Sequence, residues 1–166
     1  GSVGGIAKAV GGFAFKSKVF QGSGFPVIKI KNIVGDGTVS VKGAQCIGTE
    51  DADSALKFSL RDGDLLMAMT GATVGKIGLV VNGSKSAFLN QRVAKLMGRS
   101  IENLSSFLFC FFKDRANFEQ IVGIAGGSAQ PNISSSGIES VQCAIPSNDL
   151  LARFKERADP NFEKWI

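Results

Sequence analysis

The sequence predicts an α+β fold, in which short strands fill the first part of the chain and helices follow them. The acidic turn Asp62-Gly63-Asp64 precedes the apolar run 65–69, which is short enough to form a buried strand. A second apolar run at 77–81 ends at Asn82-Gly83, the strongest short hairpin signal in the chain. The strand after this hairpin is expected to end at residues 90–92.

Further strands are predicted from shorter patterns. Residues 27–33 alternate, so that Ile28 and Ile30 share one face and Lys29 and Lys31 share the other. A glycine-rich turn then leads into a strand at 38–41, and residues 141–145 form the last strand of the chain. Residues 45–59 are polar and irregular, which indicates a surface loop.

Two stretches show helical spacing of their apolar residues. Phenylalanines and leucines recur through residues 101–122, with a break expected near 114–117. A terminal helix begins after Ser147, a suitable N-cap, and Asp159-Pro160 allows it to kink or restart. This helix is expected either to be truncated or to meet a partner helix, because an apolar stripe follows it to the end of the chain, namely Leu151, Phe154, Ala158, Phe162 and Trp165.

The composition is that of one soluble globular domain. Of its 166 residues, 44% are hydrophobic and 20% are charged. Three widely separated cysteines and the lack of histidine exclude the usual zinc spacings and a disulfide framework, and they favour a reducing intracellular compartment. No apolar run approaches the ~20 residues of a membrane span, and residues 1–5 are expected to be a linker or a cloning remnant.

Positive charge is concentrated in one segment of this chain, whose net charge is +5. Residues 13–43 contain five lysines against the single aspartate Asp36, a net charge of +4. This asymmetry suits an anionic partner, although lysines on one strand face more often only meet solvent. The phenylalanines at the start of the segment are expected to anchor it to the core while its lysines reach outward, namely Lys16, Lys18, Lys29, Lys31 and Lys42.

The glycine-rich loop 70–76 is not a phosphate-binding P-loop. Only three residues separate Gly71 from Gly75, and a strand rather than a helix is expected to follow. The loop therefore predicts either a plain strand connection or a polar surface that presents Thr70, Thr73 and Lys76 to a partner.

A second polar loop covers residues 123–136, and its glycines allow a close approach of backbone. Either it is a flexible linker or it presents side chains around Pro131, which keeps the residue before it extended. The presented side chains would be Ser128, Gln130 and Asn132.

Recognisable catalytic motifs are lacking. There is no histidine for general-base work, and no serine or cysteine stands in a known nucleophile motif. One enzyme alternative is a small metal-dependent nuclease or nucleotide hydrolase that uses Asp62, Asp64 and Lys76, although Asp-Gly-Asp is more typical of a turn. Another alternative is a protein-interaction module that binds through Phe154, Phe162 and Trp165.

Six short motifs follow one another along nearly the whole chain: GGFAFKSKVF (11–20), FPVIKIKNI (25–33), DGDLLMAMTGATVGKIG (62–78), LNQRV (89–93), GGSAQPNIS (126–134) and IPSNDLLARF (145–154). In this order they resemble the target recognition domain of the specificity subunits of type I restriction–modification systems. Each motif alone is weakly specific, but the set in sequence is much more so.

The resemblance implies an irregular β-rich DNA-recognition lobe with a smaller α/β part and the start of a C-terminal spacer helix. Such a domain recognises one half of a bipartite double-stranded DNA target in the prokaryotic cytoplasm, and its spacer helix docks methyltransferase subunits. Methylation and cleavage belong to the methyltransferase and motor–nuclease subunits. Those partners would bind S-adenosylmethionine, ATP and magnesium, and this chain itself would bind no cofactor.

The chain also departs from the family pattern. Full specificity subunits have two recognition domains and two long helices, whereas this chain has one domain, expected at residues 1–146, and the start of one helix, expected at 147–166. It is therefore expected to be an excised domain, a half-length subunit or a fragment, which would work with a second recognition domain or a second copy of itself.

The resemblance and the side-chain chemistry together predict DNA contacts. Lysines would contact phosphates, whereas amides would pair with adenine and arginine with guanine in the major groove. The predicted contact residues are Lys16, Ser17, Lys18, Lys29, Lys31, Asn32, Thr70, Thr73, Lys76, Asn90, Gln91, Arg92, Ser128, Gln130 and Asn132.

Overall fold

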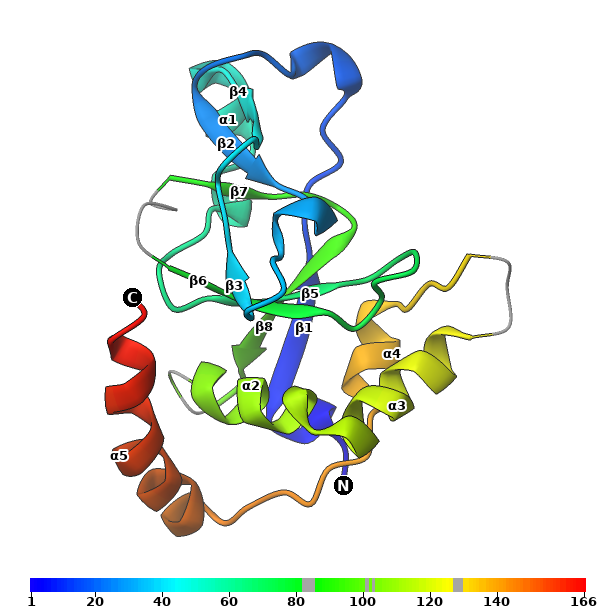
Figure 1. Ribbon diagram of the computed structural model, residues 1–166, viewed down its shortest axis with the longest axis vertical. Coiled ribbons are helices and arrows are strands. Elements are labelled where there is room, and N and C mark those ends of the chain that lie inside the picture. Colours follow the sequence, from blue (N-terminus) through cyan, green and yellow to red (C-terminus); the bar gives the residue numbers. More distant parts are fainter. Residues whose placement is uncertain (82–85, 101, 103, 127–129) are drawn as a thin grey trace.

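The computed structural model describes residues 1–81, 86–100, 102, 104–126 and 130–166 (Figure 1). Two sheets and a layer of helices make up this part of the chain, which confirms the predicted α+β class. The larger sheet has the order β1 (Ala7–Gly11), β8 (Val93–Gly98), β5 (Leu65–Ala68), β6 (Ile77–Val80) and β3 (Thr38–Val39). The smaller sheet has the order β4 (Gln45–Ile47), β2 (Phe25–Ile28) and β7 (Phe88–Leu89).

The predicted central strands β5 and β6 are buried on both faces. Along β5, Leu65 and Met67 belong to the core beneath the helices, while Leu66 and Ala68 belong to a second core on the side of the smaller sheet. Successive side chains of a strand point to opposite faces, so a strand between two cores needs a continuous apolar run. The pattern of 65–69 follows from this position, and β5 and β6 pair antiparallel as a hairpin would. The Asn82-Gly83 turn predicted to join β6 to the next strand lies outside the described residues.

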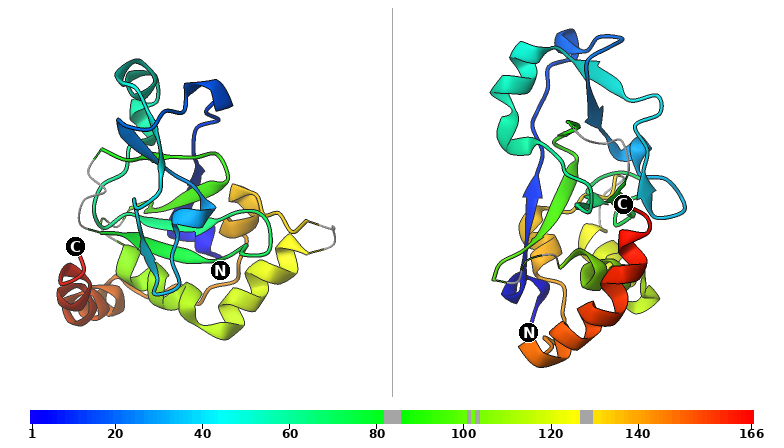
Figure 2. Two further views of the ribbon diagram at one scale, coloured as in Figure 1. Left: turned by 45° about the horizontal axis from the view of Figure 1, so that its top comes forward. Right: turned by 90° about the vertical axis from the view of Figure 1, so that its left-hand side faces the viewer.

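The helices are α1 (Thr49–Ser54), α2 (Ser105–Lys113), α3 (Arg115–Ala125), α4 (Ser135–Glu139) and α5 (Asn148–Glu163). Helices α2, α3 and α4 cover the larger sheet on the face opposite the smaller sheet, whereas α1 lies beside the smaller sheet (Figures 1 and 2). The predicted helix at 101–122 is two helices, and its predicted break falls at Asp114, whose carboxylate accepts hydrogen bonds from the N–H groups of Ala116 and Asn117 at 3.0 and 3.3 Å. Residues 101 and 103 lie outside the described residues.

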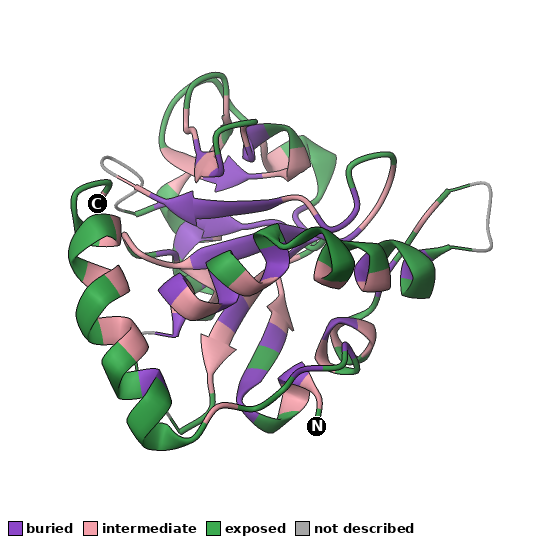
Figure 3. Cartoon of the chain, turned by 60° about the horizontal axis from the view of Figure 1, so that its bottom comes forward, coloured by how far each residue is buried: buried purple, intermediate pink, exposed green. Residues whose placement is uncertain are grey.

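The terminal helix α5 packs on α2 of its own chain. Its N-cap is Ser147, as predicted, and it continues through Pro160 without restarting. The ring of Phe162 lies edge-on to the ring of Phe109, with 5.2 Å between their centroids, and the ring of Trp165 lies 5.9 Å from Phe109. This aromatic packing holds the end of the helix, while Trp165 stays 44% exposed, and the expectation of a partner helix remains a prediction. Figure 3 shows that the rest of α5 is largely exposed.

Several local predictions were wrong. The strand predicted at 27–33 ends at Ile28, because residues 30–32 form a 3-10 turn that a buried Asn32 side chain holds. The loop predicted at 45–59 contains β4 and α1, each of which has only one buried residue, Ile47 and Ala52, too few for a periodic signal. Residues 141–145 form only one isolated β-bridge, between Ser2 and Gln142, instead of a strand.

Two strands of the larger sheet and the structure of the N-terminal segment were not predicted either. Strands β1 and β8 pair over five residues, and neither was recognised in the sequence. Residues 1–5, expected to be a linker or a cloning remnant, contribute Val3 to the main core, where it is 1% exposed. The backbone N–H of Val3 donates to the carbonyl of Val141 at 2.9 Å, so this segment belongs to the fold.

Replacing Phe162 with alanine should lower the free energy of unfolding by about 1–3 kcal/mol, below the ~3–5 kcal/mol of a fully buried phenylalanine because Phe162 is half-buried. Urea unfolding measures this difference. The control is Arg153→Ala at an exposed position of α5, where a change within ~0.5 kcal/mol is expected. Equal stability of the two variants would contradict the packing of α5 on α2.

Candidate nucleic-acid interface

An open cleft of about 980 Å³ lies where four separate segments of the chain meet. It is formed by the turn after β2, the loop between β5 and β6, the turn between β7 and β8, and the segment before α4. Six of the predicted contact residues line it, namely Thr70, Thr73, Gln91, Arg92, Gln130 and Asn132. Residues far apart in sequence are thus brought to one place.

Backbone hydrogen bonds of Met69 hold three of these segments together. Its N–H donates to the carbonyl of Arg92 at 3.0 Å, and its carbonyl accepts from the N–H of Ile133 at 2.9 Å. Beside it, the N–H of Gly71 donates to the carbonyl of Pro131 at 2.9 Å. Met69 is 8% exposed, so these bonds are shielded from water, and breaking one would leave a buried polar group unsatisfied.

The turn after β7 is fixed by the basic segment 13–43 and by β2. The N–H of Gln91 donates to the carbonyl of Phe13 at 3.0 Å, and the N–H of Asn90 donates to that of Ile28 at 3.1 Å. Gly12 permits this docking, because a Cβ atom there would lie 2.3 Å from the carbonyl oxygen of Leu89. These backbone bonds hold the turn that presents Gln91 and Arg92 in the cleft.

The loop 70–76 rests on α3. Gly75 has φ +83°, and a Cβ atom there would lie 2.8 Å from the side chain of Ile121. Only glycine fits both the conformation and the space. Val74 is buried at 5% exposure, whereas Thr73 is exposed at the tip. Strand β6 follows this loop, which confirms the prediction that a strand comes next and not the helix of a P-loop.

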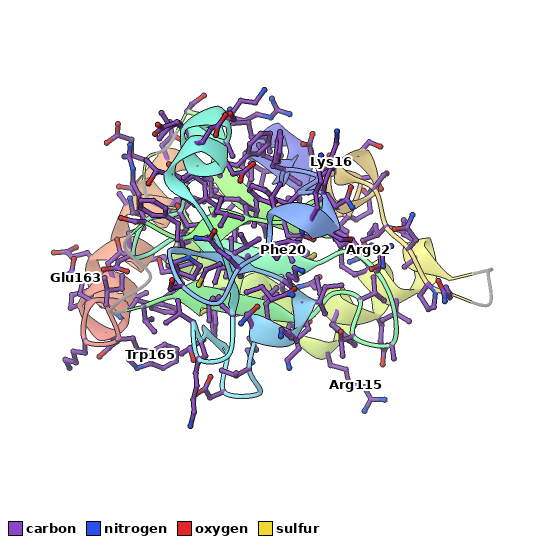
Figure 4. The ribbon with its side chains drawn as sticks, turned by 90° about the horizontal axis from the view of Figure 1, so that it is seen from above. Lys16, Phe20, Arg92, Arg115, Glu163 and Trp165 are labelled. Carbon is purple, nitrogen blue, oxygen red and sulfur yellow. The ribbon has the colours of Figure 1, made fainter. Side chains whose placement is uncertain are left out.

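Three side chains of the cleft have donors that meet no partner within the described part of the chain. Gln91, Arg92 and Asn132 are exposed, and their side chains make no hydrogen bond or ion pair with other described residues. Gln130 is exposed beside them. Amides and guanidinium groups form paired hydrogen bonds with planar acceptors and donors such as base edges. Figure 4 shows Arg92 on the opposite side of the molecule from Glu163 and Trp165.

Two predicted contact residues have structural positions instead. Asn32 is 2% exposed, and its side chain accepts from the N–H of Lys29 at 3.0 Å and donates to the carbonyl of Ser40 at 2.9 Å. Asn90 is 9% exposed beneath the turn that carries Gln91. The Asn32 side chain holds the turn that carries Ile30, and neither asparagine lines the cleft. Sequence alone did not distinguish them from exposed amides.

Lys29 and Lys31 lie on either side of Ile30, the residue of the 3-10 turn that lines the cleft. The ammonium group of Lys29 lies 3.8 Å from the ring centroid of Phe20 and donates to Gln45 at 2.5 Å, and burial, followed by the nearby charge of Lys31, lowers its pKa. The ammonium group of Lys31 donates to the carbonyl of Gly43 at 3.1 Å and stays exposed. Because the strand ends before them, the two lysines do not share a strand face as predicted.

The other predicted contacts lie around the cleft. Lys16, Ser17 and Lys18 are exposed, and the two lysines line a separate depression together with Asp51, which offsets part of their charge. In Figure 4, Lys16 lies on the same side as Arg92. Lys76 lines a smaller recess on the far side of the loop 70–76. Ser128 lies outside the described residues.

The residues of the enzyme alternative do not come together. Asp64 precedes β5 and pairs with Lys95 at 3.3 Å, and Asp62 lies in the same turn. Lys76 adjoins the other end of β5, roughly 13 Å away along a four-residue strand. Within the described part of the chain, no group of three or more acidic, cysteine or histidine side chains could hold a metal ion. The proposed acid–lysine constellation is therefore wrong.

Sequence reasoning missed the apolar part of the cleft. Ile30, Ala72 and Pro131 line it between the polar side chains. Ile30 was predicted to share a strand face with Ile28, but this strand ends two residues earlier. No sequence signal marked it as a surface residue, because its exposure follows from the 3-10 turn.

These features define a class, an α+β domain that gathers exposed amides and a guanidinium group in one open cleft beside basic turns. The family model described as the type I restriction modification DNA specificity domain matches residues 1–149, and the chain belongs to this family. The resemblance drawn from the six motifs is thereby confirmed. Domains of this family provide the DNA specificity of type I restriction–modification systems. No curated protein matches the sequence.

Three solved structures have a similar fold. One comes from work on the assembly and conformational transition of the type I R-M system. It matches with a TM-score of 0.65 and 17% sequence identity, and the match covers 98% of this chain and 37% of the solved chain. The S subunit from M. genitalium has a TM-score of 0.54 and 16% identity over 84% of this chain and 32% of its own. The HsdS subunit from Thermoanaerobacter tengcongensis has a TM-score of 0.59 and 15% identity over 99% of this chain and 37% of its own. The chain thus spans about a third of the solved chains it matches.

Replacing Asn32 with alanine should lower the free energy of unfolding by about 1–3 kcal/mol, because the change leaves the N–H of Lys29 and the carbonyl of Ser40 without their buried partner. Chemical denaturation measures the loss. Asn132→Ala is the matched control, an exposed asparagine whose replacement should change stability by less than ~0.5 kcal/mol. If the control were the less stable variant, Asn32 would not support the turn.

Proposed function

We propose that this domain reads one half of a bipartite double-stranded DNA target and directs methyltransferase and restriction subunits to it. The observation that carries the proposal is the convergence of Thr70, Gln91, Arg92, Gln130 and Asn132 on one cleft from three separate motifs. Membership of the DNA specificity family supports it. The chain would then contribute recognition, and the bond-making steps would take place on the partner subunits.

Within this proposal the cleft faces the major groove. Arg92 can form a bidentate pair with guanine, and the amides of Gln91, Gln130 and Asn132 can pair with adenine. The groove is about 12 Å wide, so it admits protruding loops. Lys29 and Lys31 at the edge of the cleft, with Lys16 and Lys18 beyond them, would meet the phosphates and fix the register of the protein on the duplex.

The partners in this proposal follow from the family. A second recognition domain, or a second copy of this chain, would read the other half of the target. Methyltransferase subunits and a motor–nuclease subunit would bind S-adenosylmethionine, ATP and magnesium, so the chain itself would carry no cofactor. None of the described helices is long and apolar enough to cross a membrane, and we propose that the complex works in the prokaryotic cytoplasm.

Removal of the amides at one edge of the cleft should change which sequences are bound. The double variant Gln130→Ala, Asn132→Ala should lose about 1–3 kcal/mol of discrimination at one base-pair position. Selection from a random duplex library, with the chain assembled with its methyltransferase subunits, measures this preference. Asn161→Ala, an exposed amide on α5, is the control and should retain the parental preference. An unaltered preference in the double variant would remove this loop from the reading surface.

Removal of a phosphate contact should weaken binding to every sequence alike. Lys31→Ala is expected to lower affinity without changing the selected sequence, and to reduce the slope of log affinity against log salt by about 1. Fluorescence titrations at several salt concentrations measure both quantities. Lys164→Ala on α5 should leave the slope unchanged. A sequence-dependent loss with Lys31→Ala would assign this lysine to base reading instead.

A further inference from the structure

The cleft contains an apolar side chain at a position where a DNA-binding surface has a specific use for one. Ile30 lines the cleft together with Gln91, Arg92 and Asn132. Part of its side chain packs against the second core, beside buried residues of the larger sheet, and part remains exposed. In the major groove the apolar feature of a base edge is the C5-methyl group of thymine.

The turn that carries Ile30 is rigid. The buried side chain of Asn32 bonds to the backbone of Lys29 and of Ser40, at 3.0 and 2.9 Å. Two backbone bonds add to these, from the N–H of Asn32 to the carbonyl of Lys29 at 2.9 Å and from the N–H of Ser40 to the carbonyl of Asn32 at 2.8 Å. A side chain on a turn that four such bonds hold can contribute to specificity, because the backbone that carries it does not adapt to the base.

The neighbouring side chains suit the same base pair. In an A·T pair the major-groove edge presents N7 and N6 of adenine, followed by O4 and the C5-methyl group of thymine. An apolar side chain beside an amide that pairs with adenine can therefore meet the methyl group of the paired thymine. The cleft provides both kinds of group, with Asn132 and Gln91 as amides and Ile30 as the apolar side chain.

We infer that Ile30 is a specificity-determining residue that packs against the C5-methyl group of a thymine in the recognised half-site. This inference rests on the proposed function and adds one defined base contact to it. The lysines on either side of Ile30, Lys29 and Lys31, would place the turn against the backbone of the same groove. The contact discriminates thymine from cytosine, which lacks the methyl group.

Single thymines replaced by deoxyuridine test the inference, because this replacement removes only the methyl group. The half-site is first selected with the chain assembled with methyltransferase subunits, and each thymine in it is then replaced in turn. For the parental protein, one position should lose about fourfold in affinity, which corresponds to about 0.8 kcal/mol for one buried methyl group at 1.4 kcal/mol per tenfold.

The variant Ile30→Ala should bind the thymine and deoxyuridine duplexes at this position equally well, while other positions respond as before. Ile124→Ala, an exposed isoleucine on α3 outside the cleft, should retain the fourfold difference. If Ile30→Ala does not fold, Ile30→Thr, which keeps the branched shape, must also reduce the difference. A full fourfold difference in the Ile30 variants, or no sensitive thymine in the parental protein, overturns the inference.

The two levels of the proposal fail in different ways. A selection that returns no preferred sequence overturns the proposed function of the cleft. A clear preference whose response to deoxyuridine does not depend on Ile30 overturns only the thymine contact.

Discussion

The cleft depends on the backbone of one buried residue, Met69. Strand β5 ends just before it, so its N–H and carbonyl are free to bond outside the sheet, to Arg92 on one side and to Ile133 on the other. An unmade hydrogen bond at such a site costs about 1–3 kcal/mol. The arrangement of three loops around one strand end is therefore enforced by polar groups that must be satisfied.

The two cores have separate consequences for this surface. The helical core, with α2, α3 and α4, supports the loop 70–76 through the contact between Gly75 and Ile121. The second core and the small sheet hold the basic segment, whose phenylalanines pack together with ring centroids 4.8 Å apart between Phe13 and Phe15. The amides that we propose to read bases and the lysines that we propose to contact phosphates thus come from different parts of the fold, the amides in the cleft and the lysines around it. Loops on a rigid scaffold are a common basis for recognition.

Helix α5 has a definite place in the fold. Leu151 is 2% exposed in the main core, and Phe162 and Trp165 pack on Phe109 of α2. In the short contact between Ser106 and Asp159, at 2.5 Å, a buried hydroxyl donates to a carboxylate across the same interface. Part of the apolar stripe is therefore engaged within the domain, while Trp165 stays 44% exposed.

The sequence by itself determined the elements whose signals are local. The apolar runs of β5 and β6, the helix break at Asp114, the cap at Ser147 and the polar loops around 70–76 and 130–132 all follow from residue type and spacing. The ordered motifs also identified the family.

Only the tertiary structure decided which polar residues are buried. Asn32 and Asn132 are chemically identical, yet Asn32 is 2% exposed and bonds to the backbone of Lys29 and Ser40, whereas Asn132 is exposed. The predicted strand through Ile30 ends at Ile28, and the turn that Asn32 holds makes Ile30 part of the cleft. Burial depends on groups distant in sequence, and spacing along the chain carries no record of them.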